Sequence, residues 1–571
     1  MGSHGPADTT RWRTFPGGKT LVVAARTVTS TVRVLESLPA LLRDDPRIDV
    51  VYAHDPTSAF GDGVLDLLHD TGARVMPWEQ LGTLTPPPDL ILSASENIDV
   101  PEGTCPVLVL PHGIGFQKYV PDSRSADDRL SGLVPDRLLE AGRAWLAVSH
   151  PDQAEQLHAH RPKTAGHTLL VGDPCYDELR AALPHAAAYR RALDLPGTAR
   201  LVVLSSTWSQ NSLLGRDPGL PARLLASLPY DEFRVAAITH PNIWAGHGGS
   251  EIRRRLAAAR EAGLLLVPPV HAWRSVLPVA DLVIGDHGSV TLYGAALGRP
   301  VLLGAFGAES VPGTAAAALG ARAPRLDPAG DLLAQVRAAL AGASGHAPGP
   351  GPAADPGSGP YADLADLAFD SPGASLARLR TAVYRLLDLP EPPTAAPVAR
   401  APRPEPGPPA APVTSWRVSA SLSAALSDGG EVHVVRIPAA VADLVDRAPG
   451  AHLACRDDEP DPYLTDSASV HLHRLPVRVT RTLRDTLDRH PGSLLAAAPR
   501  VGGGFLVAVR DGRVFEAAPT GRLPDAGIAA AVVHALLEAG TPPERDTLLT
   551  VRFAGPAGSA GSEDLALRLL S

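Results

Sequence analysis

The alternation of short apolar runs with longer helical patterns over residues 19–342 is the feature that most restricts the fold of this 571-residue chain. Strands that alternate with helices are typical of parallel βαβ units, in which each helix crosses back over the sheet. The helical patterns lie at 28–42, 221–228, 251–262 and 290–297. The apolar runs predict strands at 20–25, 49–53, 90–94, 107–110, 145–148, 168–171, 201–205, 234–239, 264–267, 282–285 and 301–304.

These eleven runs are more than one compact open sheet usually holds. The simpler arrangement is a pair of doubly wound, Rossmann-like lobes of the α/β class. We expect an N-terminal lobe at 19–190 and a C-terminal lobe at 191–342.

The rest of the chain differs in composition. A flexible N-terminus is expected at 1–18, a Gly/Pro-rich insertion at 343–373, and an amphipathic helix at 374–388 that closes back onto the lobes. A Pro/Ala-rich linker at 389–415 then leads to residues 416–571. Strand patterns and one helical pattern at 525–538 predict a small, separate α+β domain there, in which we find no motif that carries chemistry.

Composition excludes several classes of protein. A net charge of −9 and a pI of about 6.1 argue against a general nucleic-acid binder, which needs a basic face. No apolar stretch is long enough to span a membrane, and the N-terminus lacks the apolar core of a signal peptide. The cysteines at 105, 175 and 455 form neither a zinc-binding spacing nor a disulfide framework. We therefore expect a cytoplasmic protein without metal or cofactor.

The basic residues are almost all arginine, since only positions 19, 118 and 163 are lysine. Together with abundant Ala, Pro and Gly, this bias is typical of a bacterial gene of high GC content.

Three polar clusters directly follow predicted strands. His112 and Gly113 follow the strand at 107–110, His240 follows the strand at 234–239, and Asp286 begins the run DHGSV after the strand at 282–285. In open parallel sheets, ligands bind outside the carboxyl ends of the strands. If the two lobes face each other, the three clusters meet in one cleft.

The run DHGSV has the features of a phosphate-binding turn. Gly288 permits close approach of the backbone, and Ser289 places a hydroxyl at the start of a helix, whose free N–H groups favour an anion. The alternative is that Asp286 and Ser289 only cap the helix.

Three further side chains have candidate roles. His112 can act as a general base, because imidazole titrates near neutral pH. Its alternative role is a hydrogen bond to a loop carbonyl. Lys118 stands out because the chain avoids lysine, although it can equally be a solvated loop charge. His240 can bind a donor phosphate or simply end its strand.

The order of these motifs resembles that of the CDP-glycerol glycerophosphotransferase family, the teichoic-acid primases and polymerases. The resemblance covers about residues 100–320 and does not reach the C-terminal domain. The matching segments are an HG…K segment (His112, Gly113, Lys118), a G-x-P-x-x-D turn (Gly172, Pro174, Asp177), a strand end (Thr207, Trp208), an HP pair (His240, Pro241) and the segment Asp286, His287, Gly288, Ser289 and Val290.

This resemblance implies a GT-B fold and transfer of a glycerophosphate, polyol phosphate or sugar from a nucleotide-diphosphate donor, such as a CDP-linked one, to an acceptor hydroxyl. It implies that His112, His240 and Asp286 form the catalytic set, with His112 as the base. Gly113, Lys118, Thr207, Trp208, His287, Gly288, Ser289 and Val290 would bind substrate. The C-terminal lobe would hold the donor. The acceptor would be an unknown hydroxyl that can be lipid-linked, in cell-envelope polymer synthesis at the inner face of the membrane.

The sequence departs from the family in three places. His287 and Gly288 replace its Tyr-Ser pair, Cys175 replaces an arginine, and the spacing from His112 to Lys118 is one residue longer. Two other functions therefore stay open. One is an enzyme like UDP-N-acetylglucosamine 2-epimerase, which would need several carboxylates in the site. The other is a non-catalytic nucleotide-binding or interaction protein.

Overall fold

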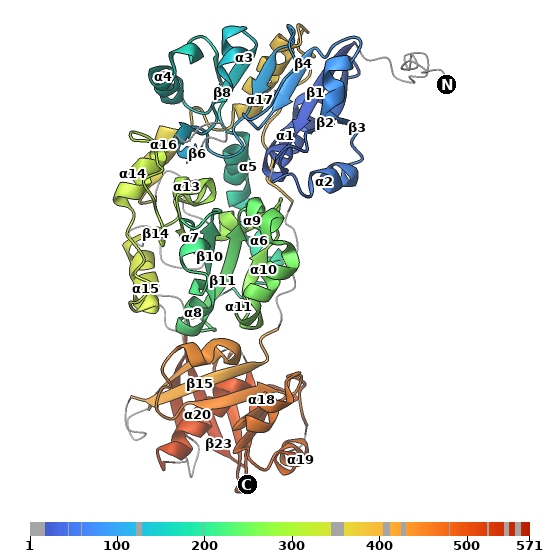
Figure 1. Cartoon of the computed structure of the whole chain (residues 1–571). Coiled ribbons are helices and arrows are strands. Elements are labelled where there is room, and N and C mark those ends of the chain that lie inside the picture. Colours follow the sequence, from blue (N-terminus) through green and yellow to red (C-terminus); the bar gives the residue numbers. More distant parts are fainter. Residues whose placement is uncertain are drawn as a thin grey trace, which may run out of the picture.

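The chain forms two α/β lobes and a barrel, stacked end to end (Figure 1). The computed structural model describes residues 18–570 except for 44, 59, 122–127, 198, 344–358, 404–411, 424–429, 479, 522, 524, 542–546 and 554–560. Residues 1–17 of the expected flexible N-terminus and 344–358 of the expected insertion lie outside this description. Within the described residues, no helix is both long enough and apolar enough to cross a membrane.

The first lobe contains a seven-stranded sheet with the order β3-β2-β1-β4-β5-β8-β9, in which every pairing is parallel. Successive side chains point to opposite faces of a strand, so Leu21 joins the core on one face and Val22 the core on the other. Burial on both faces explains why these strands read as continuous apolar runs. The strands are β1 (Lys19–Ala25), β2 (Ile48–His54), β3 (Val75–Pro77), β4 (Leu90–Ser93), β5 (Val107–Val109), β8 (Ala144–Val148) and β9 (Thr168–Leu170).

Helices cover both faces of this sheet. These helices are α1 (Val28–Leu42), α2 (Val64–Asp70), α3 (Asp136–Glu140) and α4 (Pro151–His160). The next helix, α5 (Pro174–Ala182), buries its side chains in the core of the second lobe. A short hairpin of β6 (Tyr119–Pro121) and β7 (Asp128–Leu130) lies outside the sheet.

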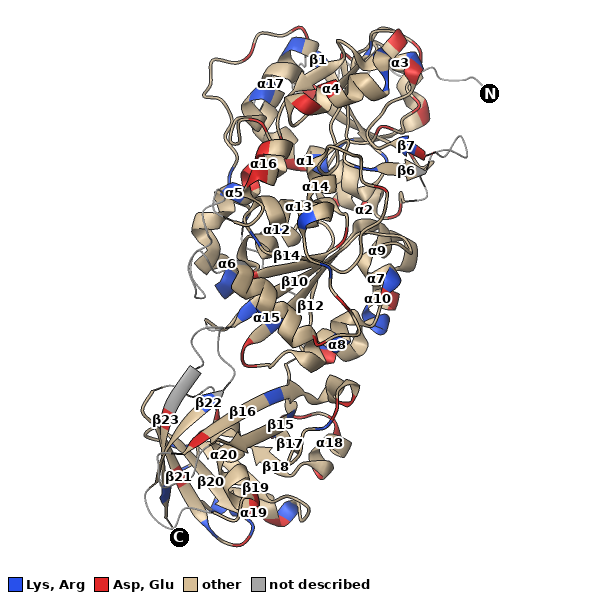
Figure 2. Ribbon diagram, turned by 90° about the vertical axis from the view of Figure 1, so that its left-hand side faces the viewer, with Lys and Arg blue, Asp and Glu red and all other residues tan. Residues whose placement is uncertain are grey.

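The second lobe contains a five-stranded parallel sheet with the order β12-β11-β10-β13-β14. Leu201 and Val202 again belong to cores on opposite faces. Charged residues lie mainly on the surrounding helices and loops (Figure 2). The strands are β10 (Arg200–Ser206), β11 (Phe233–Thr239), β12 (Leu265–Val267), β13 (Leu282–Gly285) and β14 (Val301–Leu303). All eleven predicted strands are present, and the prediction of two parallel α/β lobes is confirmed.

Two of the three helices predicted in the second lobe are present, at 221–228 and 290–297, the third differs, and the other helices of this lobe were not predicted. The helix expected at 251–262 is two helices, separated at Leu256. The helices of this lobe are α6 (Ala186–Ala192), α7 (Leu213–Arg216), α8 (Leu220–Ser227), α9 (Pro241–His247), α10 (Gly249–Arg255), α11 (Ala257–Glu261), α12 (Trp273–Val276), α13 (Ser289–Ala296), α14 (Ala315–Arg322) and α15 (Leu332–Ala343).

After the second lobe the chain returns to the first through α16 (Ala362–Ala368) and α17 (Ser375–Leu386). Leu379 and Val383 of α17 are buried in the core that α1 also joins. The Asp177 carboxylate accepts hydrogen bonds from the Gly373 and Ser375 amides at 2.6 and 3.1 Å, and so caps the start of α17.

The C-terminal region is a closed nine-stranded barrel, so the prediction of a small α+β domain was wrong. Closure depends on pairing of strands far apart in sequence, which local patterns do not reveal. The strand order is β15 (Ser415–Leu422), β16 (Glu431–Pro438), β22 (Thr547–Phe553), β23 (Gly561–Leu569), β21 (Val514–Pro519), β20 (Phe505–Val509), β19 (Leu495–Pro499), β18 (Val470–Leu472) and β17 (His452–Arg456).

Helix α20 (Ala526–Glu538) shares one core with the strands of the barrel and is buried from Ala526 to Leu536. Its many alanines make it narrow enough to be surrounded by strands. The remaining helices of this region are α18 (Pro462–Ser467) and α19 (Arg481–Arg489).

The barrel packs against the second lobe through a buried arginine. The Arg436 side chain is 2% exposed, and its Nε donates to an Asp231 carboxylate oxygen at 2.8 Å. Its Nη1 donates to both Asp525 oxygens, at 2.9 and 2.8 Å. The Tyr230 and Trp416 rings also meet, with centroids 5.8 Å apart. The barrel is therefore fixed on the lobe by specific contacts.

Candidate functional site

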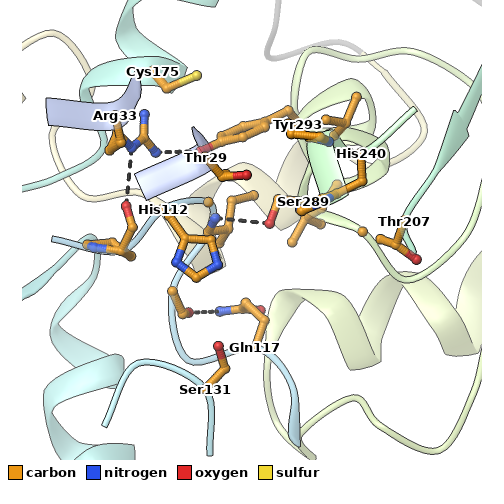
Figure 3. Close-up of a pocket in the computed structure, with 18 of the residues that line it drawn as sticks. Thr29, Arg33, His112, Gln117, Ser131, Cys175, Thr207, His240, Ser289 and Tyr293 are labelled. Carbon is orange, nitrogen blue, oxygen red and sulfur yellow. Dashed lines mark hydrogen bonds between the residues drawn. The ribbon is translucent and has the colours of Figure 1, made fainter. Parts of the chain in front are cut away.

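A pocket between the two lobes joins the polar clusters that follow β5, β11 and β13 (Figure 3). Both lobes contribute loops at the carboxyl ends of their strands, as expected for a ligand site in parallel sheets. Trp208 and Asp286, two of the predicted site residues, do not line it. Those that do are His112, Gly113, Lys118, Thr207, His240, His287, Gly288, Ser289 and Val290.

The hydrogen bonding of His112 leaves one ring nitrogen free to accept a proton. Its Nδ1 lies 3.2 Å from the Ala94 carbonyl oxygen, which can only accept, so Nδ1 carries the proton. Nε2 is then unprotonated, and the ring is open to the pocket. Desolvation in the cleft lowers the pKa of His112, the Glu96 carboxylate opposes this, and the Lys118 charge adds to it. The ring is therefore neutral at pH 7.

His240 has the opposite tautomer. It precedes α9, and its Nδ1 accepts a hydrogen bond from the Asn242 amide at 3.1 Å, so the proton must be on Nε2. Desolvation, with the charges of Lys118 and His112, lowers the pKa of His240 to about 3. His240 is therefore a neutral hydrogen-bond donor.

Lys118 places a positive charge among these rings. Desolvation lowers its pKa, and the more distant carboxylates of Asp286, Glu96 and Glu309 oppose that effect. Among the described residues, no carboxylate forms an ion pair with it. His287 also lines the pocket, and its buried Nδ1 has no hydrogen-bond partner in the described part of the chain. An anion in the pocket would satisfy both groups.

Asp286 lies below the pocket and holds the phosphate-type turn together. One carboxylate oxygen accepts from the Thr207 amide, the Thr207 hydroxyl and the Leu213 amide at 2.8, 2.9 and 2.9 Å. The other accepts from the Gly288 amide at 3.0 Å. Its side chain is fully buried. These four hydrogen bonds give Asp286 a structural role in the turn, and its catalytic role stays a prediction.

Packing explains why position 288 is glycine. A Cβ on Gly288 would lie 2.5 Å from Cγ2 of Thr207 and 3.1 Å from an Asp286 oxygen. Gly288 is also the N-cap of α13 without a side-chain cap, so first-turn amides of α13 lie next to the pocket.

Ser289 joins the two lobes. Its hydroxyl accepts a hydrogen bond from the Ile114 amide at 3.1 Å (Figure 3). A Cβ on Gly113 would lie 2.5 Å from the same hydroxyl oxygen, so glycine is needed there for the lobes to approach. Gln117 adds a second link, because its side-chain oxygen accepts from the Ala316 amide at 3.1 Å.

Trp208 lies outside the pocket. It is 36% exposed, and its ring centroid lies 5.0 Å from that of Phe60 in the first lobe. The Trp208 side chain therefore bridges the lobes beside the pocket.

A buried cluster of Arg33, Asp173 and Tyr293 lies at the pocket and was not predicted from the sequence. Arg33 donates to Asp173 at 3.2 Å and to the Tyr293 hydroxyl at 3.1 Å, and that hydroxyl donates to Asp173 at 2.6 Å. Asp173 also caps α5. Because Arg33 and Tyr293 come from different lobes and line the pocket, the cluster fixes the lobes relative to each other.

A second cross-lobe network lies next to it. Arg274 of α12 pairs with Glu36 of α1 at 2.8 Å and with Glu178 of α5. Burial, together with the Glu36 charge, raises the pKa of Glu178 to about 7, although Arg274 opposes the shift. These residues could not be predicted from the sequence, because they become neighbours only when α1, α5 and α12 pack together.

The G-x-P-x-x-D turn is structural. A Cβ on Gly172 would lie 2.4 Å from the Ser375 hydroxyl, so glycine is needed for α17 to pack, and Asp177 caps that helix. Cys175, where the family has arginine, lines the pocket as a buried thiol whose pKa burial raises to about 12. Within the described residues, no cluster of three or more His, Cys, Asp or Glu side chains could hold a metal ion.

No protein-family model and no curated protein matches the chain. Solved structures match at low similarity. The wall teichoic acid polymerase TagF, in a variant soaked with CDPG, has 14% identity and a TM-score of 0.35, covering 50% of this chain and 69% of its own. The Staphylococcus aureus MnaA–UDP structure has 12% identity and a TM-score of 0.40, covering 66% and 99%.

The UDP-GlcNAc 2-epimerase of Neisseria meningitidis, bound to UDP-GlcNAc, has 14% identity and a TM-score of 0.39, covering 65% of this chain and 99% of its own. Because these TM-scores are low, they establish neither a family nor an activity for this chain.

Proposed function

We propose that the protein is a nucleotide-dependent transferase with a GT-B arrangement of its lobes. The observation that carries this proposal is that His112 and His240 have opposite tautomers in one pocket. His112 presents an unprotonated Nε2, His240 presents an Nε2–H, and Lys118 adds a positive charge without an ion-pair partner among the described residues. A base and an anion-binding group in one cleft suit attack of a hydroxyl on a donor diphosphate.

The proposed donor is a nucleotide diphosphate linked to a glycerophosphate, polyol phosphate or sugar. Its diphosphate would lie near His240, Lys118, His287 and the amides at the start of α13. CDP is the nucleotide that the sequence resemblance implies.

In the proposed reaction, the acceptor hydroxyl loses its proton to Nε2 of His112 as its oxygen attacks the transferred group. The bond from that group to the nucleotide breaks, and the electron pair leaves with the nucleotide phosphate. Lys118 and the Nε2–H of His240 would stabilise the charge that develops there.

The epimerase alternative predicts several carboxylates in the site. The pocket contains Glu36 and Glu96, and both form ion pairs, with Arg274 at 2.8 Å and Arg129 at 3.0 Å. This favours the transferase over the epimerase.

The test compares the unmodified protein with His112→Ala. Thermal-shift and calorimetric titrations with CDP, UDP, GDP and their conjugates identify the nucleotide, and donor turnover is then measured. We expect His112→Ala to lower kcat by about 10²–10⁴-fold with nucleotide affinity nearly unchanged. Near-normal turnover by the variant would remove His112 as the base. Nucleotide binding without turnover by the unmodified protein would support a non-catalytic binding protein instead.

A further inference from the structure

The loop that follows β4 is a hydrogen-bonded turn that is buried next to His112. The Ser93 hydroxyl donates to the Ser95 carbonyl at 2.7 Å and accepts from the Ser95 amide at 2.9 Å. These two bonds close a tight turn around Ala94, whose carbonyl oxygen is the hydrogen-bond partner of His112 Nδ1. Ser93, Ser95 and Glu96 are all less than a tenth exposed. The loop can therefore hold the imidazole in one orientation.

Glu96 ends this turn and lines the same pocket as His112. Its Oε1 accepts from Nη2 of Arg129 at 3.0 Å, and its side chain is 9% exposed. Arg129 belongs to β7, so the hairpin outside the sheet fixes the position of the carboxylate. Sequence patterns gave no reason to single out Glu96.

The charges that face His112 explain what Glu96 can do. Lys118 on the next loop and Arg33 of α1 are cations, and both disfavour a second positive charge on the imidazole. Glu96 is the carboxylate that opposes them and desolvation, and it raises the pKa of His112 relative to the pocket without it. The effect is mutual, since burial opposes ionisation of Glu96 while the charges of His112 and Arg129 lower its pKa overall.

We infer that Glu96 is a positioning residue for His112: it ends the turn whose Ala94 carbonyl fixes the tautomer, and its carboxylate stabilises the imidazolium formed during transfer. The inference rests on the proposed function. When the acceptor hydroxyl gives its proton to Nε2, a positive charge appears on His112 between Lys118 and Arg33. The Glu96 carboxylate offsets that charge. After transfer, Nε2 loses the proton to solvent, and His112 is neutral again for the next turnover.

The experiment measures the titration of His112 directly by NMR of the full-length protein labelled in histidine, with the His112 signal assigned by its loss in His112→Gln. We expect Glu96→Gln to lower the pKa of His112, because it removes the favourable carboxylate. Glu36→Gln is the matched control, since Glu36 also lines the pocket but pairs with Arg274, and it should leave that titration unchanged. An unchanged His112 titration in folded Glu96→Gln would overturn the inference.

Turnover gives an independent readout. An opposite charge nearby shifts a pKa by about one to three, so Glu96→Gln should lower kcat by about 10- to 1000-fold and move the acid limb of the pH–rate profile. Glu96→Asp keeps the charge and should restore most of the loss, whereas equal loss in both variants would count against the electrostatic role. If the unmodified protein turns over no donor, the proposed function fails, and the NMR titration still decides the coupling.

A double variant covers the case in which Glu96→Gln does not fold. Replacing both Glu96 and Arg129 by glutamine leaves neither member of the ion pair as an unpaired charge, and it should still lower the pKa of His112, because Glu96 is the carboxylate that raises it. An unchanged or raised pKa of His112 in that variant would contradict the inference.

Discussion

Replacing Asp286 by asparagine tests whether this residue holds the turn or takes part in chemistry. The carboxylate accepts four hydrogen bonds from four donors, three on one oxygen and one on the other. An asparagine side chain has one oxygen and one NH₂ group, so at least one buried donor must face another donor. If the amide oxygen keeps the three bonds to Thr207 and Leu213, the Gly288 amide loses its acceptor.

The magnitude follows from these four contacts. A buried donor left without a partner costs about 1–3 kcal/mol, and a hydrogen bond to a charged group contributes about 1.5–3 kcal/mol. Asp286→Asn should therefore destabilise the second lobe by roughly 3 kcal/mol. Because Gly288 leads into α13, the displaced turn should also weaken nucleotide binding.

Urea denaturation measures the first effect, and calorimetry with the nucleotide that binds the unmodified protein measures the second. Asp281→Asn is the matched control. Asp281 accepts a hydrogen bond from the Leu201 amide at 2.7 Å, at the opposite end of β10, so its loss should reduce stability but leave nucleotide affinity intact. The reasoning is refuted if Asp286→Asn keeps normal stability and affinity while turnover collapses, since Asp286 would then act in the chemistry.

Four further predictions follow from the site and the barrel. His240→Ala should weaken nucleotide binding as well as turnover, because it removes the Nε2–H donor; calorimetry showing unchanged affinity would place the diphosphate elsewhere. Gly288→Val should destabilise the turn by overlap with Thr207 and reduce nucleotide affinity, measured by thermal melting and calorimetry, and normal values for both would contradict the packing argument. Arg436→Met should cost about 3–5 kcal/mol in urea denaturation because Asp231 is left buried and unpaired, whereas Arg417→Met, whose partner Asp443 is 93% exposed, should cost little. Burial and neighbouring histidines lower the pKa of His452 to about 3 and of His471 to about 4. In the unfolded chain these histidines have a pKa of about 6.5, so below that pH the unfolded state binds more protons than the folded barrel. The barrel should therefore have its full stability above pH 6.5 and lose stability as the pH decreases toward 4, and a melting temperature that does not change over that range would refute this.

The sequence determined the two parallel sheets. Strands buried on both faces must be continuously apolar, and that signal is local, so runs such as β1 and β10 could be recognised one at a time. It also determined where the pocket would form, because residues that follow parallel strands meet at one edge of a sheet. His112, His240 and His287 were found by this rule.

The tertiary structure alone decided the roles of several residues. Asp286 was predicted as a site residue from its position after β13, and only the structure shows that it also holds the turn. Its four donors come from segments about 70 to 80 residues earlier and from its own turn, and its side chain is fully buried. Arg33 and Tyr293 become partners only when the lobes face each other, and Glu96 meets Arg129 only through the hairpin that contains β7.

The closed barrel was also not predictable from the sequence, because it depends on which strands pair. Its closure requires β15 to pair with both β16 and β17, and β16 with β22, more than a hundred residues away. Local periodicity shows that a segment can be a strand, but the choice of neighbour depends on the surface that distant segments bury together. Which strands pair therefore depends on the packing of the whole core, and this can be seen only in the tertiary structure.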